Sequence, residues 1–208
     1  MHAEDIWDYW ADRYEGLWVQ KYSLRPTREK IIAELGLILE PEKKYRILDM
    51  GCGTGQLLRG IQANFADYDI DYTGVDISYK MIEAAKERSN GMNFIVSGVE
   101  SFNAEDGLFD IVLCSHSFPY YRDKKSAIGK FHRMVKSGGY LFLAQASQNN
   151  LYDGIIMPFV RLTTSKARYP GVKEIQDLLA GKFAIRKTER IWERFYMPSI
   201  YMFAGQKL

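Results

Sequence analysis

The segment 47–55, Ile-Leu-Asp-Met-Gly-Cys-Gly-Thr-Gly, constrains the fold of this chain more than any other. An apolar run ends in Asp49, glycine then occupies every second position, and helix formers follow. Glycine adopts backbone dihedrals that other residues avoid and lets the backbone approach a ligand closely. A helix N-terminus beside such a turn offers unpaired N–H groups. The segment therefore predicts a buried strand, a tight turn and a helix start that together bind a cofactor.

The spacing of the glycines argues against two other nucleotide sites. A phosphate-binding P-loop needs a Gly-Lys-Ser/Thr ending, and no such lysine is present. The dinucleotide fingerprint G-x-G-x-x-G needs a glycine where this chain has Gln56. The segment instead has G-x-G-x-G preceded by an acid.

This pattern resembles motif I of the class I S-adenosylmethionine-dependent methyltransferases. The resemblance implies S-adenosylmethionine as cofactor and S-adenosylhomocysteine as product. It also implies an α/β, Rossmann-like, doubly wound fold with a mostly parallel seven-stranded sheet that ends in a C-terminal antiparallel hairpin. The alternation of short strands with helical stretches between residues 45 and 146 independently favours a parallel sheet covered on both faces.

A second acid follows the next apolar run. Asp76 ends the stretch 72–76, where a carboxylate at the end of the second strand can accept hydrogen bonds from both ribose hydroxyls. A purely structural interpretation is that Asp76 only precedes a helix capped by Ser78. The glycine turn upstream favours the ribose role.

The resemblance continues through strands expected at 92–96 and 109–114 and through a helix, glycine turn and strand over 131–143. Ligands of open α/β sheets bind beyond the carboxyl ends of the strands. In the family an Asp is common where this chain has Gly98 or Val99, so Glu100 or a backbone carbonyl is left to contact adenine. The cofactor contacts that the resemblance implies are Tyr14, Tyr22, Asp49, Gly51, Cys52, Gly53, Gly55, Gln56, Asp76, Ile77, Met81, Val99, Glu100, Cys114 and Ser115.

The composition indicates one globular domain over residues 1–208. Of the 208 residues 47% are apolar, which suits one core, and the 28 basic and 26 acidic residues nearly balance, which gives no reason to expect a nucleic-acid partner. Cys52 and Cys114 form no disulfide framework and no metal motif, as expected in the cytoplasm. We see no leader peptide and no membrane span, and we expect a monomer or homodimer without a metal site.

Two segments frame the predicted site. Residues 4–15 and 27–39 read as helices, and the aromatic side chains among residues 1–40 predict a helical lid over the cofactor. Arg28 could pair with the methionine carboxylate of the cofactor, although an arginine in a first helical turn is more often solvated. The irregular stretch 147–170 lies between the fifth and sixth strands, a place that often shapes substrate choice in the family. We expect it to form a substrate cap.

His116 is the titratable residue best placed for catalysis, because it follows the fourth strand and has an ordinary pKa near 6.5. It could act as a general base, or it could pack on adenine or cap the strand. The expected acceptor-binding residues are Tyr120, Tyr121, Tyr152 and Arg161.

The sequence favours a methyltransferase that moves a methyl group to a small-molecule acceptor by in-line displacement. Two alternatives stay open at this stage. One is a protein that binds S-adenosylmethionine without transferring methyl, and the other is an NAD-binding reductase of the same layered architecture. The acceptor and its reacting atom are not apparent from the residues.

Overall fold

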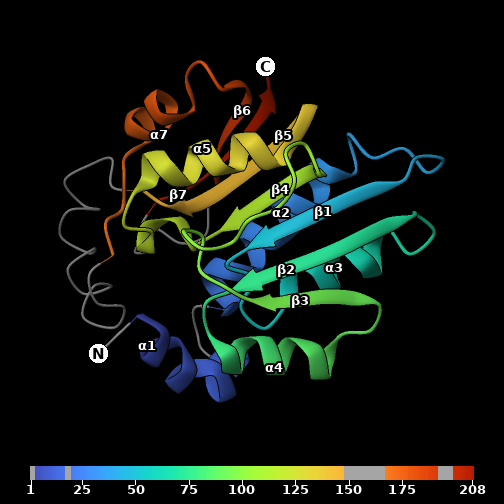
Figure 1. Cartoon of the computed structure of the whole chain (residues 1–208), viewed down its shortest axis with the longest axis vertical. Helices are drawn as coiled ribbons and strands as arrows, with labels where there is room; N and C mark the ends of the chain where they lie inside the picture. Colours follow the sequence, from blue (N-terminus) through green and yellow to red (C-terminus); the bar gives the residue numbers. More distant parts are fainter. Residues whose placement is uncertain (1–2, 17–19, 148–166, 192–198) are drawn as a thin grey trace.

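The computed structural model describes residues 3–16, 20–147, 167–191 and 199–208, and it is built around one seven-stranded sheet (Figure 1). The spatial order of the strands is β3-β2-β1-β4-β5-β7-β6. Their bounds are β1 Tyr45–Met50, β2 Ile70–Asp76, β3 Met92–Val96, β4 Phe109–Ser115, β5 Val135–Ala146, β6 Phe183–Ile191 and β7 Ile200–Lys207.

The sheet is parallel except at one strand. β1 pairs in parallel with β2 and β4, β2 with β3, and β4 with β5, whereas β7 runs antiparallel to both β5 and β6. This arrangement confirms the predicted Rossmann-like sheet with a C-terminal antiparallel hairpin. The expected glycine turn before the fifth strand lies inside β5, where the register with β4 shifts and Gly138 has a φ of +74°.

Helices cover both faces of the sheet. On one face α2 Arg25–Leu35, α3 Gln56–Asn64 and α4 Tyr79–Arg88 pack their apolar sides against β1 and β2. On the other face α5 Lys124–Met134 and α7 Val172–Leu179 cover β4 and β5, and α5 crosses in front of the strands in Figure 1. Because both faces are buried at the centre of the sheet, β4 is a nearly continuous apolar run.

The N-terminal helices differ from the sequence prediction. The helix expected at 4–15 is an α-helix only over α1 Ala3–Trp10, and the 3₁₀-helix η1 Ala11–Gly16 continues it. The π-helix η2 Gln20–Leu24 leads into α2, which begins two residues before Thr27 and ends at Leu35 rather than Leu39. Leu39 nevertheless stays in the core at 6% exposure, because tight turns after Leu35 fold it back onto the sheet.

The topology sets the position of the site. The chain leaves β1 toward β2 on one side, and β4 lies on its other side, so the strand order reverses between β1 and β4. Parallel strands bring their carboxyl ends to one edge, and the crevice beside such a reversal is where open α/β sheets bind ligands. The predicted cap at 147–170 lies mostly outside the described residues and stays a prediction, as does the single-domain organisation.

Candidate active site

The turn between β1 and α3 has a conformation that only glycine adopts easily. Gly51, Gly53 and Gly55 have φ angles of +80°, +52° and +77°. The amides of Gly51 and Cys52 donate to the Val75 carbonyl at 2.7 and 3.0 Å, which fastens the turn to β2. A Cβ at Gly51 would lie 2.3 Å from the Cβ of Ser117. The turn is therefore a bare backbone surface at the carboxyl edge of the sheet.

Asp76 stands beside this turn at the end of β2. Its Oδ2 accepts from the Gly53 amide at 2.8 Å, and its Oδ1 accepts from the Ser78 amide at 3.0 Å. Burial raises the pKa of the Asp76 carboxyl, and these backbone hydrogen bonds oppose that rise. Each carboxylate oxygen has a second lone pair, so Asp76 is held in a fixed orientation with capacity for further donors.

A cavity of about 380 Å³ opens between the glycine turn and the loop after β4. It is the size of a small-molecule site. Twelve of the residues predicted to contact cofactor, acceptor or both line it: Tyr14, Gly51, Gly53, Asp76, Ile77, Met81, Val99, Glu100, Ser115, His116, Tyr120 and Tyr121. The structure therefore brings residues from five separate segments of the sequence to one cavity.

Other predicted site residues lie behind this lining. Cys52 is buried under the turn, Gly55 packs against the ring of Phe94, and Cys114 is fully buried. The side chain of Gln56 lies beside Glu15 on η1, where it helps to lower the pKa of that carboxyl. Direct contact of these four with a ligand stays a prediction. Three more, Tyr152, Arg161 and the side chain of Tyr22, lie outside what the structure describes.

Asp49 lies beneath the turn and is unusual for a buried acid. It is 2% exposed, and its Oδ1 has no hydrogen-bond partner among the described residues. Burial raises the pKa of Asp49 to about 7, and the neighbouring Asp76 carboxylate adds to the effect. A buried carboxylate without donors is costly, so the site contains acceptor capacity for a cationic or hydrogen-bond-donating ligand group.

Part of the N-terminal segment lies over the turn, and its role as a lid stays a prediction. Cε1 of Tyr14 lies 3.6 Å from where a Cβ on Gly53 would be. The Trp7 ring, which also lines the cavity, meets the rings of Tyr14 and Tyr120 edge-on, with centroids 6.4 and 5.1 Å away. Burial raises the pKa of Tyr14 to about 12, with a further contribution from Asp76. Tyr14 is therefore a neutral phenol in this enclosure.

His116 has backbone and side-chain features that suit a special role. Its φ is +62°, the one positive value among the non-glycine residues that the structure describes. Its Nε2 lies 3.0 Å from Thr27 Oγ1, and that hydroxyl donates to the Ser23 carbonyl at 2.9 Å. The Thr27 proton is thus committed, so Nε2 carries the proton and Nδ1 is the acceptor. Burial lowers the pKa of His116 to about 4, assisted by the nearby Arg28 cation.

Tyr121 and Ser117 join the two sides of the cavity. Their hydroxyls are 2.9 Å apart and both donate to the Met50 carbonyl, Ser117 at 2.7 Å and Tyr121 at 3.1 Å. The Sγ of Cys114 lies 3.2 Å from the Ser117 hydroxyl. Burial raises the pKa of Tyr121 well above its ordinary value. The Tyr121 hydroxyl therefore holds the loop after β4 against the end of β1.

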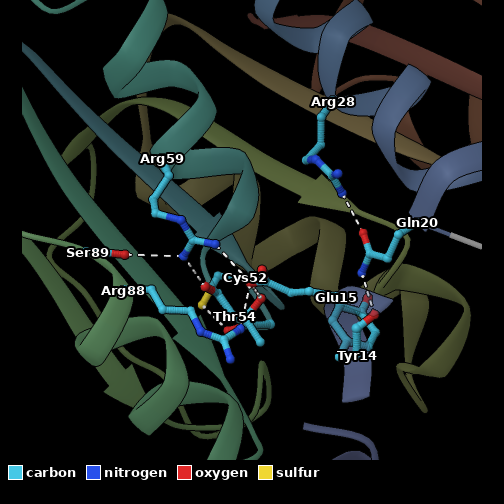
Figure 2. Close-up of polar contacts among 10 residues, drawn as sticks. Tyr14, Glu15, Gln20, Arg28, Cys52, Thr54, Arg59, Arg88 and Ser89 are labelled. Atoms are coloured by element: carbon cyan, nitrogen blue, oxygen red, sulfur yellow. Dashed lines mark hydrogen bonds and ion pairs between the residues drawn. The ribbon is translucent and has the colours of Figure 1, made fainter. Parts of the chain in front are cut away.

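Some residues of the site are not apparent from the sequence. The sequence did not assign Trp7 to the site, and it favoured a solvated Arg28. In the structure Trp7 lines the cavity, and Arg28 is partly buried and donates to Gln20 Oε1 at 3.0 Å, as Figure 2 shows. Burial lowers the pKa of Arg28. Ser97 and Gly98, which follow β3, were foreseeable from the strand-end rule. The remaining lining residues that the sequence did not single out are Met50, Ser117 and Arg122.

The described residues contain neither a metal-binding cluster nor a membrane-spanning helix. Within residues 3–16, 20–147, 167–191 and 199–208, no three His, Cys, Asp or Glu side chains are grouped to hold a metal ion. No helix in these ranges has the length and hydropathy to span a bilayer.

Comparison with known proteins identifies the domain. Residues 48–143 match a family described as "Methyltransferase domain". A demethylmenaquinone methyltransferase of Thermotoga maritima is 28% identical over 145 residues, which are 69% of this chain and 61% of the relative. The chain spans from 36% to 65% of the length of the first four curated relatives that it matches.

Solved structures share the fold over the full chain. A methyltransferase of Thermotoga maritima, described as a possible histamine N-methyltransferase, has a TM-score of 0.76 at 19% identity and covers 100% of both chains. The magnesium protoporphyrin IX methyltransferase of Synechocystis, solved with S-adenosylhomocysteine, has a TM-score of 0.75 at 19% identity and covers 99% of each. These structures show the shared fold, and the matched domain, with its glycine turn and sheet order, identifies residues 48–143 as a class I S-adenosylmethionine-dependent methyltransferase domain.

Proposed function

We propose that the chain transfers a methyl group from S-adenosylmethionine to a small-molecule acceptor. The observation that carries the proposal is the cavity in which the bare backbone of Gly51 and Gly53 meets the oriented Asp76 carboxylate. Two curated relatives support a small acceptor, because their names specify demethylmenaquinone and ubiquinone biosynthesis.

The lining residues fit the parts of this cofactor. The second lone pairs of Asp76 can accept from the two ribose hydroxyls. Glu100 supplies an acceptor for the adenine amine, and its carboxylate folds beside Gly98, with Oε2 3.4 Å from where a Cβ would be. Gly53 has no side chain to fill the cavity beside Tyr14, and we place the methionine part there. The Asp49 Oδ1 beneath the turn, which has no partner among the described residues, could accept from the cationic amino group of the cofactor.

The cofactor supplies a methyl group on a positively charged sulfur. The protein has to hold the acceptor atom in line with that group and exclude water. Trp7, Tyr14 and Tyr120 form the apolar cover for this purpose, which supports the assignment of residues 1–40 as a lid.

We assign the acceptor side to the loop after β4. Nδ1 of His116 is a neutral acceptor, because Nε2 donates to Thr27. With a pKa near 4 this imidazole keeps its lone pair at neutral pH but is a weak base, so it suits a hydroxyl acceptor whose proton becomes strongly acidic as the methyl group bonds to the oxygen. His116 is therefore the proposed general base, and Tyr120 and Arg122 complete the acceptor wall.

Calorimetric titration with S-adenosylmethionine, S-adenosylhomocysteine and NAD tests the proposal. We expect micromolar binding of the two adenosyl ligands and no binding of NAD. Asp76→Ala should weaken binding about 100-fold, because hydrogen bonds to a charged group contribute about 1.5–3 kcal/mol. Asp71→Ala is the matched control, since Asp71 lies at the other end of β2 and its side chain is 55% exposed.

NAD binding without binding of the adenosyl ligands would refute the proposal and favour the reductase. When S-adenosylmethionine binds, formation of S-adenosylhomocysteine with pooled phenols, carboxylic acids and amines separates an enzyme from a protein that only binds the cofactor.

A further inference from the structure

A carboxylate of the N-terminal segment is anchored behind the glycine turn. Glu15 of η1 accepts two hydrogen bonds at Oε1, from Thr54 Oγ1 at 2.7 Å and Arg59 NH2 at 2.9 Å, and the same oxygen pairs with Arg88 NH1 at 2.9 Å (Figure 2). Although burial raises it, the hydrogen bonds from Thr54, Arg88 and Gln56 lower the pKa of Glu15 to about 2. Glu15 is thus ionised throughout the physiological range.

The donors around Glu15 come from three elements. Thr54 is part of the glycine turn and is 1% exposed, Arg59 lies on α3, and Arg88 lies on α4. Arg59 NH1 also donates to the Thr54 carbonyl at 2.5 Å, so one guanidinium bridges Glu15 and the backbone of the turn. Cooperative, charge-assisted contacts of this kind hold geometry better than an isolated surface pair does.

The residue before Glu15 faces the cavity. Tyr14 lies over Gly53. Figure 2 shows the Glu15 side chain directed toward Thr54 and Arg59. The carbonyl of Tyr14 accepts from Gln20 Nε2 at 3.1 Å, which Arg28 orients in turn. Earlier in the segment Asp8 accepts from Ser78, the buried cap of α4, at 2.5 Å. The described part of the lid is thus attached at both sides of Tyr14, and Glu15 makes the attachment that includes the turn.

We propose that Glu15 is a positioning residue that holds Tyr14 over the methyl-donor part of the cavity and couples the lid to the glycine turn. This inference rests on the proposed function. Glu15 touches no reacting atom, because its carboxylate lies behind the turn, and it acts through the position of its neighbour.

The first test is binding of S-adenosylhomocysteine to Glu15→Gln. Removal of the charge leaves the two arginines without their carboxylate, and we expect Kd to rise about tenfold, the equivalent of about 1.4 kcal/mol. Glu29→Gln is the control, because Glu29 makes an exposed i,i+4 pair with Arg25 and does not contact the turn. An affinity of Glu15→Gln within twofold of wild type would overturn the proposal.

A double-mutant cycle with Tyr14→Ala distinguishes positioning from general destabilisation. If Glu15 acts through Tyr14, then Glu15→Gln changes the Kd of Tyr14→Ala less than twofold. Fully additive effects of the two substitutions would contradict the coupling.

Hydrogen exchange in the ligand-free protein tests the attachment of Glu15 to Thr54, Arg59 and Arg88, which we call the latch, independently of ligand binding. We expect amides of residues 11–16 to exchange about tenfold faster in Glu15→Gln, with β1 and β4 unchanged. Unchanged exchange over 11–16 would refute the latch even if the ligand binds. Faster exchange in a protein whose wild type binds no adenosyl ligand would support the latch and refute the proposed function instead.

Discussion

The cavity has two walls that are built differently. The glycine wall consists of Gly51, Gly53, Asp76 and Gly98, which follow adjacent parallel strands and present backbone and one fixed carboxylate. The aromatic wall consists of Trp7, His116, Tyr120 and Arg122, which come from the N-terminal helix and from the loop after β4. The first wall takes its shape from local dihedral angles, and the second takes it from packing between distant segments.

This difference predicts separable consequences of substitution. A change in the glycine wall alters the backbone on which the cofactor lies, so it should affect folding and cofactor binding together. A change in the aromatic wall should leave the sheet intact and affect turnover. The substitutions below are ordered from the largest expected effect to the smallest.

Gly51→Ala should be the most damaging. Its φ of +80° disfavours any side chain, and the added Cβ would lie 2.3 Å from Ser117 Cβ. We expect a loss of about 2–4 kcal/mol in the free energy of unfolding, measured by urea denaturation, together with loss of S-adenosylhomocysteine binding.

Gly129→Ala is the matched control for this prediction. Gly129 lies inside α5, and a Cβ there meets nothing within 4 Å. Alanine should raise stability by about 0.5–1 kcal/mol and leave binding unchanged. Similar losses in the free energy of unfolding for the two variants would show that the positive φ of Gly51 is not the cause of the loss.

Asp49→Asn should change how stability depends on pH. The pKa of Asp49 is raised in the folded state to about 7, so its protonated form is favoured there, and stability falls as pH rises from about 4 toward 7. Between pH 5 and pH 8 the wild type should lose about 2 kcal/mol more than Asp49→Asn does. Urea denaturation of ligand-free protein at the two pH values measures this difference.

The exposed Asp71 provides the comparison for this pH effect. Asp71→Asn should show the same pH dependence as the wild type, because its side chain is 55% exposed. If the wild type and Asp49→Asn respond identically to pH, then burial does not raise the pKa of the Asp49 carboxyl.

His116→Asn should affect turnover more than binding. Asn tolerates a positive φ, so the variant keeps the backbone, and we expect kcat to fall about tenfold, or about 1.4 kcal/mol, with Kd for S-adenosylhomocysteine unchanged. Since the pKa of His116 is near 4, wild-type kcat should not vary with the ionisation of this group between pH 6 and 8.

His132→Asn serves as the control, because His132 lies on α5 and does not line the cavity. A kcat of His116→Asn equal to that of the wild type would exclude His116 as the general base. An equal loss in affinity and turnover would show that the two walls do not act separately.

The agreement between sequence and structure follows the same division. The strands, the glycine turn and Asp76 were predictable because each depends on a few consecutive residues and on the rule that parallel strand ends share an edge. The sequence also predicted a lid and placed Tyr14 in it. It did not predict the break between α1 and η1, the end of α2 at Leu35, or the direction of Gln56 toward Glu15.

The residues missed have no local signature. Trp7 and Arg28 look like ordinary helix residues until the N-terminal segment is folded against Gly53 and His116. The tautomer of His116 depends on Thr27 and Ser23, which lie about ninety residues earlier.

The sequence by itself therefore determined the glycine turn and the acids beside it, because glycine spacing and strand-end acids act through backbone conformation. Only the tertiary structure decided which residues of the N-terminal segment lie over this turn and how they are held there. The attachment of Glu15 to Thr54, Arg59 and Arg88 joins segments that are 39 or more residues apart, and no short pattern encodes which of them will meet. Contacts of that kind depend on how the helices pack on the sheet, which is a property of the whole fold.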